Sequence, residues 1–163
     1  MTDSPVPLVD LGVQHRQVAD EVAEGWAAVL SRTAFVGGAA VKEFEEAYAS
    51  YTGAAHCIGV GNGTDAIEMA LRALGVGHGD ECVVPANTFI ATAEAVARTG
   101  ATVVLADCDE ATALLDPTAA GAAVTSRTKA ILPVHLYGQA APVEAIRAAV
   151  GDVPIVEDAA QSQ

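Results

Sequence analysis

The stretch HCIGVGNGTDAIEMALRALGVGHGDECVVP, residues 56–85, decides the fold. It begins with a short apolar run, passes through a glycine-rich turn into a segment with apolar residues at helical spacing, and ends in a second apolar run at residues 81–85. Short runs rich in valine and isoleucine that alternate with helical segments are typical of strands in a parallel sheet. The stretch therefore predicts a strand–helix–strand unit with a right-handed crossover.

The same alternation continues to the end of the sequence. Further apolar runs lie at residues 101–107, 129–134 and 154–158. Segments with helical spacing lie at residues 88–99 and 142–150, with a shorter helical turn at 117–124. We therefore predict an α/β fold, a three-layer α/β/α arrangement around a mostly parallel sheet whose first strand is residues 56–60. Thr64 is the expected N-cap of the first crossover helix, and Gly75 and Gly100 are the expected stops of two helices.

The residues upstream of this sheet predict helices rather than strands. Amphipathic patterns cover residues 18–31 and 39–53, and a flexible turn around Gly37 and Gly38 separates them. We expect an N-terminal helical segment over residues 1–54, which could be a dimer arm or a lid, and the α/β domain over residues 55–163.

Composition narrows the class of protein. The 163 residues carry a net charge of -13, which would repel a nucleic-acid backbone over most of the surface. The three cysteines form no CxxC pair, so we predict buried thiols and neither a zinc site nor a disulfide framework. The first residues lack the pattern of a signal peptide, and no apolar stretch is long enough to span a membrane. We expect a cytoplasmic protein.

Parallel sheets place their ligand sites at the carboxyl ends of the strands, and three loops at these positions suit a ligand. Residues 59–65, GVGNGTD, combine glycines with a helix start, which suits a phosphate held by backbone N–H groups and a hydroxyl. The same loop also fits a turn that is capped by Thr64 and binds nothing. It lacks the GxGxxG spacing and the P-loop lysine, which counts against an unrelated nucleotide-binding domain.

The other two loops present an aromatic ring and a carboxylate. Phe89 could stack on a planar cofactor or belong to the core. Asp158, with Gln161 three residues later, could pair with a protonated pyridine nitrogen or cap a helix. His135 fits either a site near the strand end or a structural role.

Three motifs in order carry a family resemblance: residues 61–96, LPVHLYGQ at 132–139 and IVEDAAQS at 155–162. Together they resemble the sugar aminotransferases of the DegT type, which are fold-type I enzymes that use pyridoxal 5'-phosphate (PLP) to aminate keto-sugar nucleotides. The resemblance implies that residues 55–163 are the first part of the PLP-binding large domain.

The resemblance also implies roles for particular residues. Gly63 and Thr64 match the positions that hold the PLP phosphate, with Asp65 in the same motif as a phosphate or capping residue. Phe89 matches the aromatic that stacks on the pyridine ring, Asp158 matches the partner of the ring nitrogen, and Gln161 matches the amide near the ring hydroxyl.

The resemblance further implies a Schiff-base lysine downstream of the EDAAQ motif, and the sequence ends at Gln163 before that segment. The lysines present are Lys42, in an amphipathic helix, and Lys129, at the start of a strand, and neither is a credible substitute. We expect a truncated chain or a fragment that lacks transaminase activity alone and has no catalytic residue of its own.

The expected reaction of the full enzyme has two halves, in which glutamate or glutamine gives an amino group that is then transferred to a keto-sugar nucleotide. The family resemblance implies a homodimer. A different hypothesis is that the chain is a noncatalytic binding or pairing module that complements a separately encoded second half.

Overall fold

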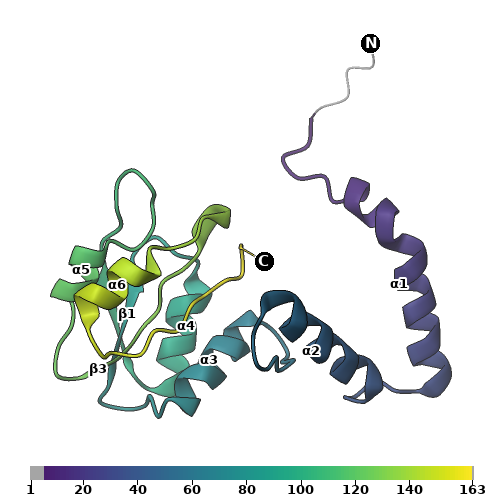
Figure 1. Cartoon of the computed structure of the whole chain (residues 1–163), viewed down its shortest axis with the longest axis horizontal. Coiled ribbons are helices and arrows are strands. Elements are labelled where there is room, and N and C mark those ends of the chain that lie inside the picture. Colours follow the sequence, from purple (N-terminus) through teal and green to yellow (C-terminus); the bar gives the residue numbers. More distant parts are fainter. Residues whose placement is uncertain (1–5, 163) are drawn as a thin grey trace. The chain divides into compact units, whose positions relative to one another are not determined.

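The computed structural model describes residues 6–162, and these fall into two compact units, one ending at Gly59 and the other beginning at Val60 (Figure 1). The division lies a few residues beyond the boundary that the sequence predicts between residues 54 and 55. Among the described residues, no helix combines the length and the apolar character that a membrane span requires.

The first unit consists of helices α1 (Gly12–Arg32) and α2 (Ala39–Thr52). Helix α1 begins six residues before the predicted start at residue 18 and ends where Thr33 takes a left-handed conformation. Helix α2 ends at Gly53, whose φ of 72° is also left-handed and suits glycine. No residue of either helix is buried within the described structure, so their apolar stripes face solvent there.

The predicted strand at residues 56–60 is not formed. A strand is stabilised by the hydrogen-bond ladder to its neighbour, and none of the described strands pairs with this segment. Within this segment, the Gly59 N–H instead donates a hydrogen bond to the Glu45 side-chain carboxylate at 2.7 Å.

The second unit is built on three parallel strands in the order β2-β1-β3. Its strands are β1 (Glu81–Pro85), β2 (Thr102–Ala106) and β3 (Thr128–Ile131). Its helices are α3 (Gly63–Ala73), α4 (Ile90–Thr99), α5 (Pro117–Ala122), the single 3-10 turn η1 (Leu136–Gly138) and α6 (Val143–Val150). The parallel sheet and the crossover helices confirm the predicted α/β class.

The predicted strand at residues 154–158 lies along β3 but is interrupted. Ile131 pairs with Ile155 and Val134 with Asp158, both in parallel, as isolated bridges. Pro133 lies between them and has no N–H to donate, so the ladder cannot be continuous there. The flanking bonds still form: Asp158 N–H donates to the Pro133 carbonyl, and His135 N–H donates to the Asp158 carbonyl, both at 3.0 Å. These bonds fix the backbone of Asp158.

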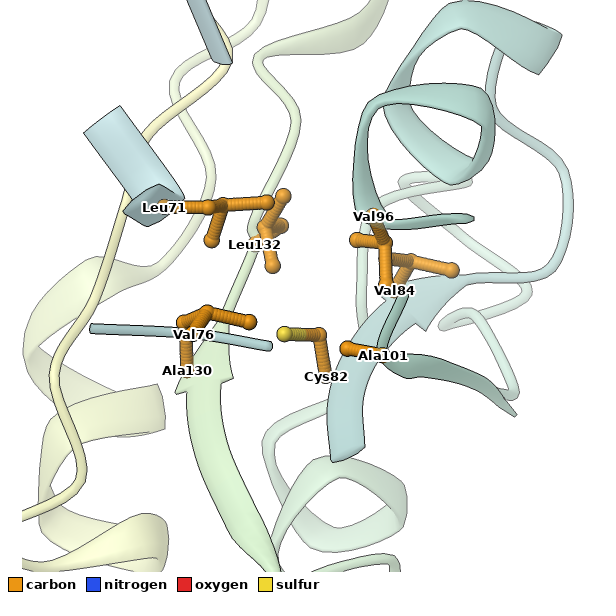
Figure 2. Close-up of a cluster of buried hydrophobic side chains, with 8 residues drawn as sticks. All are labelled: Leu71, Val76, Cys82, Val84, Val96, Ala101, Ala130 and Leu132. Carbon is orange, nitrogen blue, oxygen red and sulfur yellow. The ribbon is translucent and has the colours of Figure 1, made fainter. Parts of the chain in front are cut away.

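Buried apolar side chains cover both faces of the sheet. Between the sheet and α3 and α4 lies one cluster, shown in Figure 2, with Leu71, Val76, Cys82, Val84, Val96, Ala101, Ala130 and Leu132. Val83 points to the other face, where it packs with Ile131, Ile146 and residues of α5. Because each face is covered by helices, the second unit has the predicted three layers.

The prediction of buried thiols holds only in part. Cys82 is fully buried in β1, and burial, with Asp80 nearby, raises the pKa of its thiol to about 11. Cys57 and Cys108 are half-buried, and all three are free thiols. The Cys108 thiol donates to the Asn87 side chain at 3.0 Å.

The predicted helix stops are confirmed, and one predicted start is wrong. Gly100 ends α4 with a φ of 89°, and Gly75 follows α3 with a φ of 77°. The N-cap of α3 is Asn62 rather than Thr64, because the Asn62 side-chain oxygen accepts the Asp65 N–H at 2.9 Å. Asparagine is a stronger N-cap than threonine, and its use places Gly63 and Thr64 in the first turn of the helix.

Candidate functional site

A cavity of about 240 Å³ lies at the carboxyl edge of the sheet, where the loops after β1 and β3 meet the first turn of α3. It is lined by five of the six residues that the sequence predicts for a site: Gly63, Thr64, Phe89, Asp158 and Gln161. Ile67, Val134 and Leu136 add apolar walls. Residues that are far apart in the sequence are therefore brought together, as the position of the loops in a parallel sheet predicts.

The first turn of α3 gives the cavity a positive end. The N–H groups of a first helical turn have no partner within the helix, and the helix dipole adds partial positive charge there. Asn62 takes the Asp65 N–H, and among the described residues no acceptor takes the N–H groups of Gly63 and Thr64. This end of the cavity is suited to an anion such as a phosphate.

Asp65 is not among the cavity residues, unlike the other members of its motif. Its carboxylate accepts hydrogen bonds from the Asn62 side-chain amide at 2.9 Å and from Arg98 at 3.2 Å. Arg98 lies on α4, and it also bonds to Glu94 at 2.7 Å. Asp65 therefore connects the start of α3 to α4. These contacts favour a structural role for Asp65 beside the N-cap.

Asp158 supplies a negatively charged group to the cavity and is half-buried. Its Oδ2 accepts the hydroxyl of Thr92 at 2.8 Å, and its Oδ1 accepts the Ala160 N–H at 3.2 Å. The second contact closes a local turn. Both oxygens are thus held in place.

Phe89 occupies the N-cap position of α4 with its side chain 71 % exposed. Among residues 6–162, Phe89 therefore does not belong to the core. Its ring also borders a larger apolar groove of about 620 Å³ that runs along α4 and β2 and includes Leu105 and Val103. An exposed aromatic ring on the wall of a small cavity provides a face for a planar ligand.

Gln161 and His135 occupy the turn beside the cavity. The Gln161 side-chain oxygen accepts the Tyr137 N–H at 2.6 Å, and this orientation leaves its NH₂ group to act as a donor. His135 is buried, its Nδ1 accepts the Ala141 N–H at 2.8 Å, and its Nε2 lies 3.0 Å from Glu157 Oε2. With both ring nitrogens engaged, His135 has the structural role that the sequence left open.

Sequence reasoning missed Thr88 and Thr92. Thr88 lines the cavity, and Thr92 lies fully buried one helical turn further along, with its hydroxyl 3.2 Å from that of Thr88. The i,i+4 spacing of two threonines at a helix start is visible in the sequence. Their link to Asp158 spans 66 residues, so no local pattern could reveal it.

No group of three or more side chains suited to hold a metal ion occurs among residues 6–162. Lys129 does not line the cavity. Lys129 is exposed at the opening of β3, at the opposite edge of the sheet, and Lys42 belongs to the first unit, where it lies 3.7 Å from Glu46.

Comparison with known proteins relates this chain to aminotransferases. The DegT/DnrJ/EryC1/StrS aminotransferase family matches residues 16–163. The UDP-2-acetamido-2-deoxy-3-oxo-D-glucuronate aminotransferase of Pseudomonas aeruginosa is 45% identical over 159 residues, which are 96% of this chain and 44% of that protein.

Solved structures agree with the sequence comparison. The structure of S. venezuelae DesV in complex with a ketimine intermediate has a TM-score of 0.94 at 41% identity, over 98% of this chain and 44% of that one. The structure of ntda from Bacillus subtilis, with bound cofactor PMP, has a TM-score of 0.87 at 32% identity, over 98% of this chain and 38% of that one. The chain thus spans less than half the length of the relatives that it matches.

Proposed function

The chain belongs to the DegT/DnrJ/EryC1/StrS aminotransferase family, and we propose that it provides the PLP site of an enzyme that aminates nucleotide-linked keto sugars. The observation that carries this proposal is the convergence of the α3 N-terminus, Phe89 and Asp158 on one cavity. The named Pseudomonas aeruginosa relative acts on a 3-oxo sugar nucleotide, which supports the substrate class.

The chemistry of the cavity fits PLP or its amine form, pyridoxamine 5'-phosphate (PMP). Gly63 and Thr64 would hold the phosphate at the positive end of α3. Phe89 would cover one face of the ring and exclude water from it, and the NH₂ group of Gln161 would donate to the ring hydroxyl. The cavity volume of about 240 Å³ is a little below the roughly 300 Å³ at which pockets for drug-sized ligands begin, which suits a single substituted ring.

Asp158 would have the electrostatic role. A carboxylate beside a pyridine nitrogen favours the protonated form of that nitrogen, because opposite charges stabilise each other in a water-poor site. PLP, when bound, supplies an electron sink for bond breaking at carbon, and a protonated ring nitrogen strengthens that sink. The fixed position of both Asp158 oxygens means that little reorientation is needed when the cofactor binds.

Covalent attachment of PLP requires a lysine that forms a Schiff base with it. A lysine that forms a Schiff base is typically desolvated, and both Lys42 and Lys129 are exposed. We propose that neither of them anchors the cofactor, that the amino donor of the functional enzyme is glutamate or glutamine, and that the enzyme works as a homodimer. The support for the donor and the dimer is the family resemblance of the sequence motifs.

Calorimetric titration of the 163-residue chain with PMP tests the proposed function. We expect saturable binding with one site per chain, and a loss of about tenfold or more in affinity for Asp158→Asn, because a charge-assisted bond is worth roughly 1.5–3 kcal/mol. Asp152→Asn is the matched control, since it removes the same charge from an exposed turn away from the cavity. No saturable binding, or equal losses for both variants, would contradict the proposal.

Borohydride reduction tests whether Lys42 or Lys129 forms a Schiff base with PLP. Mixing the chain with PLP and reducing with borohydride should leave no covalent adduct at Lys42 or Lys129 in a peptide map. A stoichiometric adduct at either residue would show that the chain anchors the cofactor by itself.

A further inference from the structure

Helix α4 holds one buried side chain whose contacts are explained neither by packing nor by the roles already described. Thr92 has no exposed surface and lies on the helix face toward the sheet. Its hydroxyl has two partners, Asp158 Oδ2 at 2.8 Å and Thr88 Oγ1 at 3.2 Å. Neither partner is in the regular part of the same helix.

The contact is unusual for a threonine in a helix. A helical threonine commonly turns its hydroxyl back to a backbone carbonyl of the preceding turn. Thr99 on the same helix does this, since its hydroxyl donates to the Val96 carbonyl at 2.7 Å. Thr92 instead directs its hydroxyl to a carboxylate 66 residues away in sequence.

The direction of the hydrogen bonds follows from the carboxylate. An ionised carboxylate only accepts, so the single proton of the Thr92 hydroxyl is donated to Asp158. The Thr92 oxygen then acts as the acceptor for Thr88, whose hydroxyl donates. The result is a one-way chain from Thr88, on the cavity wall, through Thr92 to Asp158 Oδ2.

We propose that Thr92 is a positioning residue, which holds the Asp158 carboxylate in the orientation that the pyridine nitrogen of the cofactor requires. This inference rests on the proposed PLP site. The Ala160 N–H holds only Oδ1, at 3.2 Å, and the backbone bonds of Asp158 fix its Cα but not its carboxyl plane. The Thr92 hydroxyl supplies the second fixed point, and two fixed oxygens define the plane.

Thr92→Val tests the proposal, because valine keeps the branched shape of threonine and replaces its hydroxyl with a methyl group that cannot donate a hydrogen bond. Thr99→Val is the matched control: it removes a buried hydroxyl from the same helix without touching Asp158. Thr92→Ser restores the hydroxyl. Each variant is examined by crystallography for the Asp158 carboxyl plane and by titration with PMP, with melting temperature as a check on folding.

We expect the carboxyl plane to rotate in Thr92→Val and to stay in place in the other two variants. We expect PMP affinity to fall about tenfold in Thr92→Val, as for a lost bond to a charged group, and to change less than about threefold in Thr92→Ser and Thr99→Val. In an Asp158→Asn background, Thr92→Val should bring little further loss, since the two residues act through one interaction.

An unmoved carboxylate in Thr92→Val, or an affinity equal to that of Thr99→Val, would overturn the role of Thr92 and leave the proposed cofactor site standing. Wild-type chain that fails to bind PMP would overturn the cofactor site and the positioning role together. A Thr92→Val chain that fails to fold while Thr92→Ser folds and binds would assign the hydroxyl to stability instead, and would also overturn the proposal.

Discussion

Phe89 contributes little to the buried core of the described structure. Its ring is 71 % exposed at the start of α4, whereas the side chains that hold α4 on the sheet, among them Val96 and Ala95, are fully buried. Removing the ring therefore takes little away from the core. A stacked aromatic ring contributes roughly 0.5–1.5 kcal/mol beyond the area that it buries.

Phe89→Ala should therefore weaken PMP binding about three- to tenfold and leave the melting temperature almost unchanged. Ile90→Ala is the control, because Ile90 is a similarly exposed neighbour that borders the larger groove and not the cofactor cavity. Titration and thermal unfolding measure the two effects. A large loss of stability in Phe89→Ala, or equal binding losses in both variants, would count against the stacking role.

At the scale of elements, strands β1 and β3 are joined at their amino ends by a buried carboxylate. Glu81 is 5 % exposed, and it accepts hydrogen bonds from the Arg127 guanidinium and the Thr125 hydroxyl just before β3. These bonds, from Thr125 first and then Arg127, hold the pKa of Glu81 below its usual value of 4.5. A lowered pKa in the folded state means that folding favours the ionised form.

The stability of the folded chain should therefore fall at acidic pH, as Glu81 becomes protonated. The stabilisation from ionised Glu81 is present above pH 4.5 and is lost as the pH falls from 4.5 through the lower folded pKa. Glu81→Gln should lower the melting temperature at neutral pH and flatten its decline below pH 4.5. Thermal unfolding between pH 3 and 7 measures both, with Asp152→Asn as an exposed control. A variant that melts like wild type at pH 7 would contradict the link.

Much of this element pattern could be predicted from the sequence, because periodicity and helix stops are local signals. Helices α4 and α6 start and end within about two residues of their predicted bounds. The predicted strands are wrong where strand formation depends on hydrogen bonds to a neighbouring strand. Residues 56–60 have the composition of a strand and no partner to pair with, and Pro133 breaks the ladder to residues 154–158.

For the second unit as a whole, the residues that line the site could be predicted from the sequence, but the contacts between them could not. The rule that ligands bind at the carboxyl edge of a parallel sheet predicted that Phe89 and Asp158 lie close together, and both line one cavity. Thr64 lines the same cavity, although the strand predicted before it at residues 56–60 is not formed. The contacts that fix them could not be read from the sequence. Thr92 to Asp158 and Arg98 to Asp65 join residues that only the folded α4 brings within reach.

These long-range contacts give α4 a central position. The Thr92 hydroxyl bonds to Asp158 on the cavity wall, Arg98 bonds to Asp65 in the first turn of α3, and Phe89 lies at the N-cap of α4. The buried face of α4, with Val96 and Ala101 after it, packs on β1 in the cluster of Figure 2. Helix α4 therefore connects the buried core to residues of the cavity wall.

A crystal structure of the chain grown with PMP tests most directly whether this cavity is a cofactor site. We predict the phosphate at the N–H groups of Gly63 and Thr64, the ring against Phe89, and the ring nitrogen within hydrogen-bond distance of Asp158. A PMP molecule bound elsewhere, or a cavity without ligand at saturating PMP, would contradict the assignment of this cavity as the cofactor site.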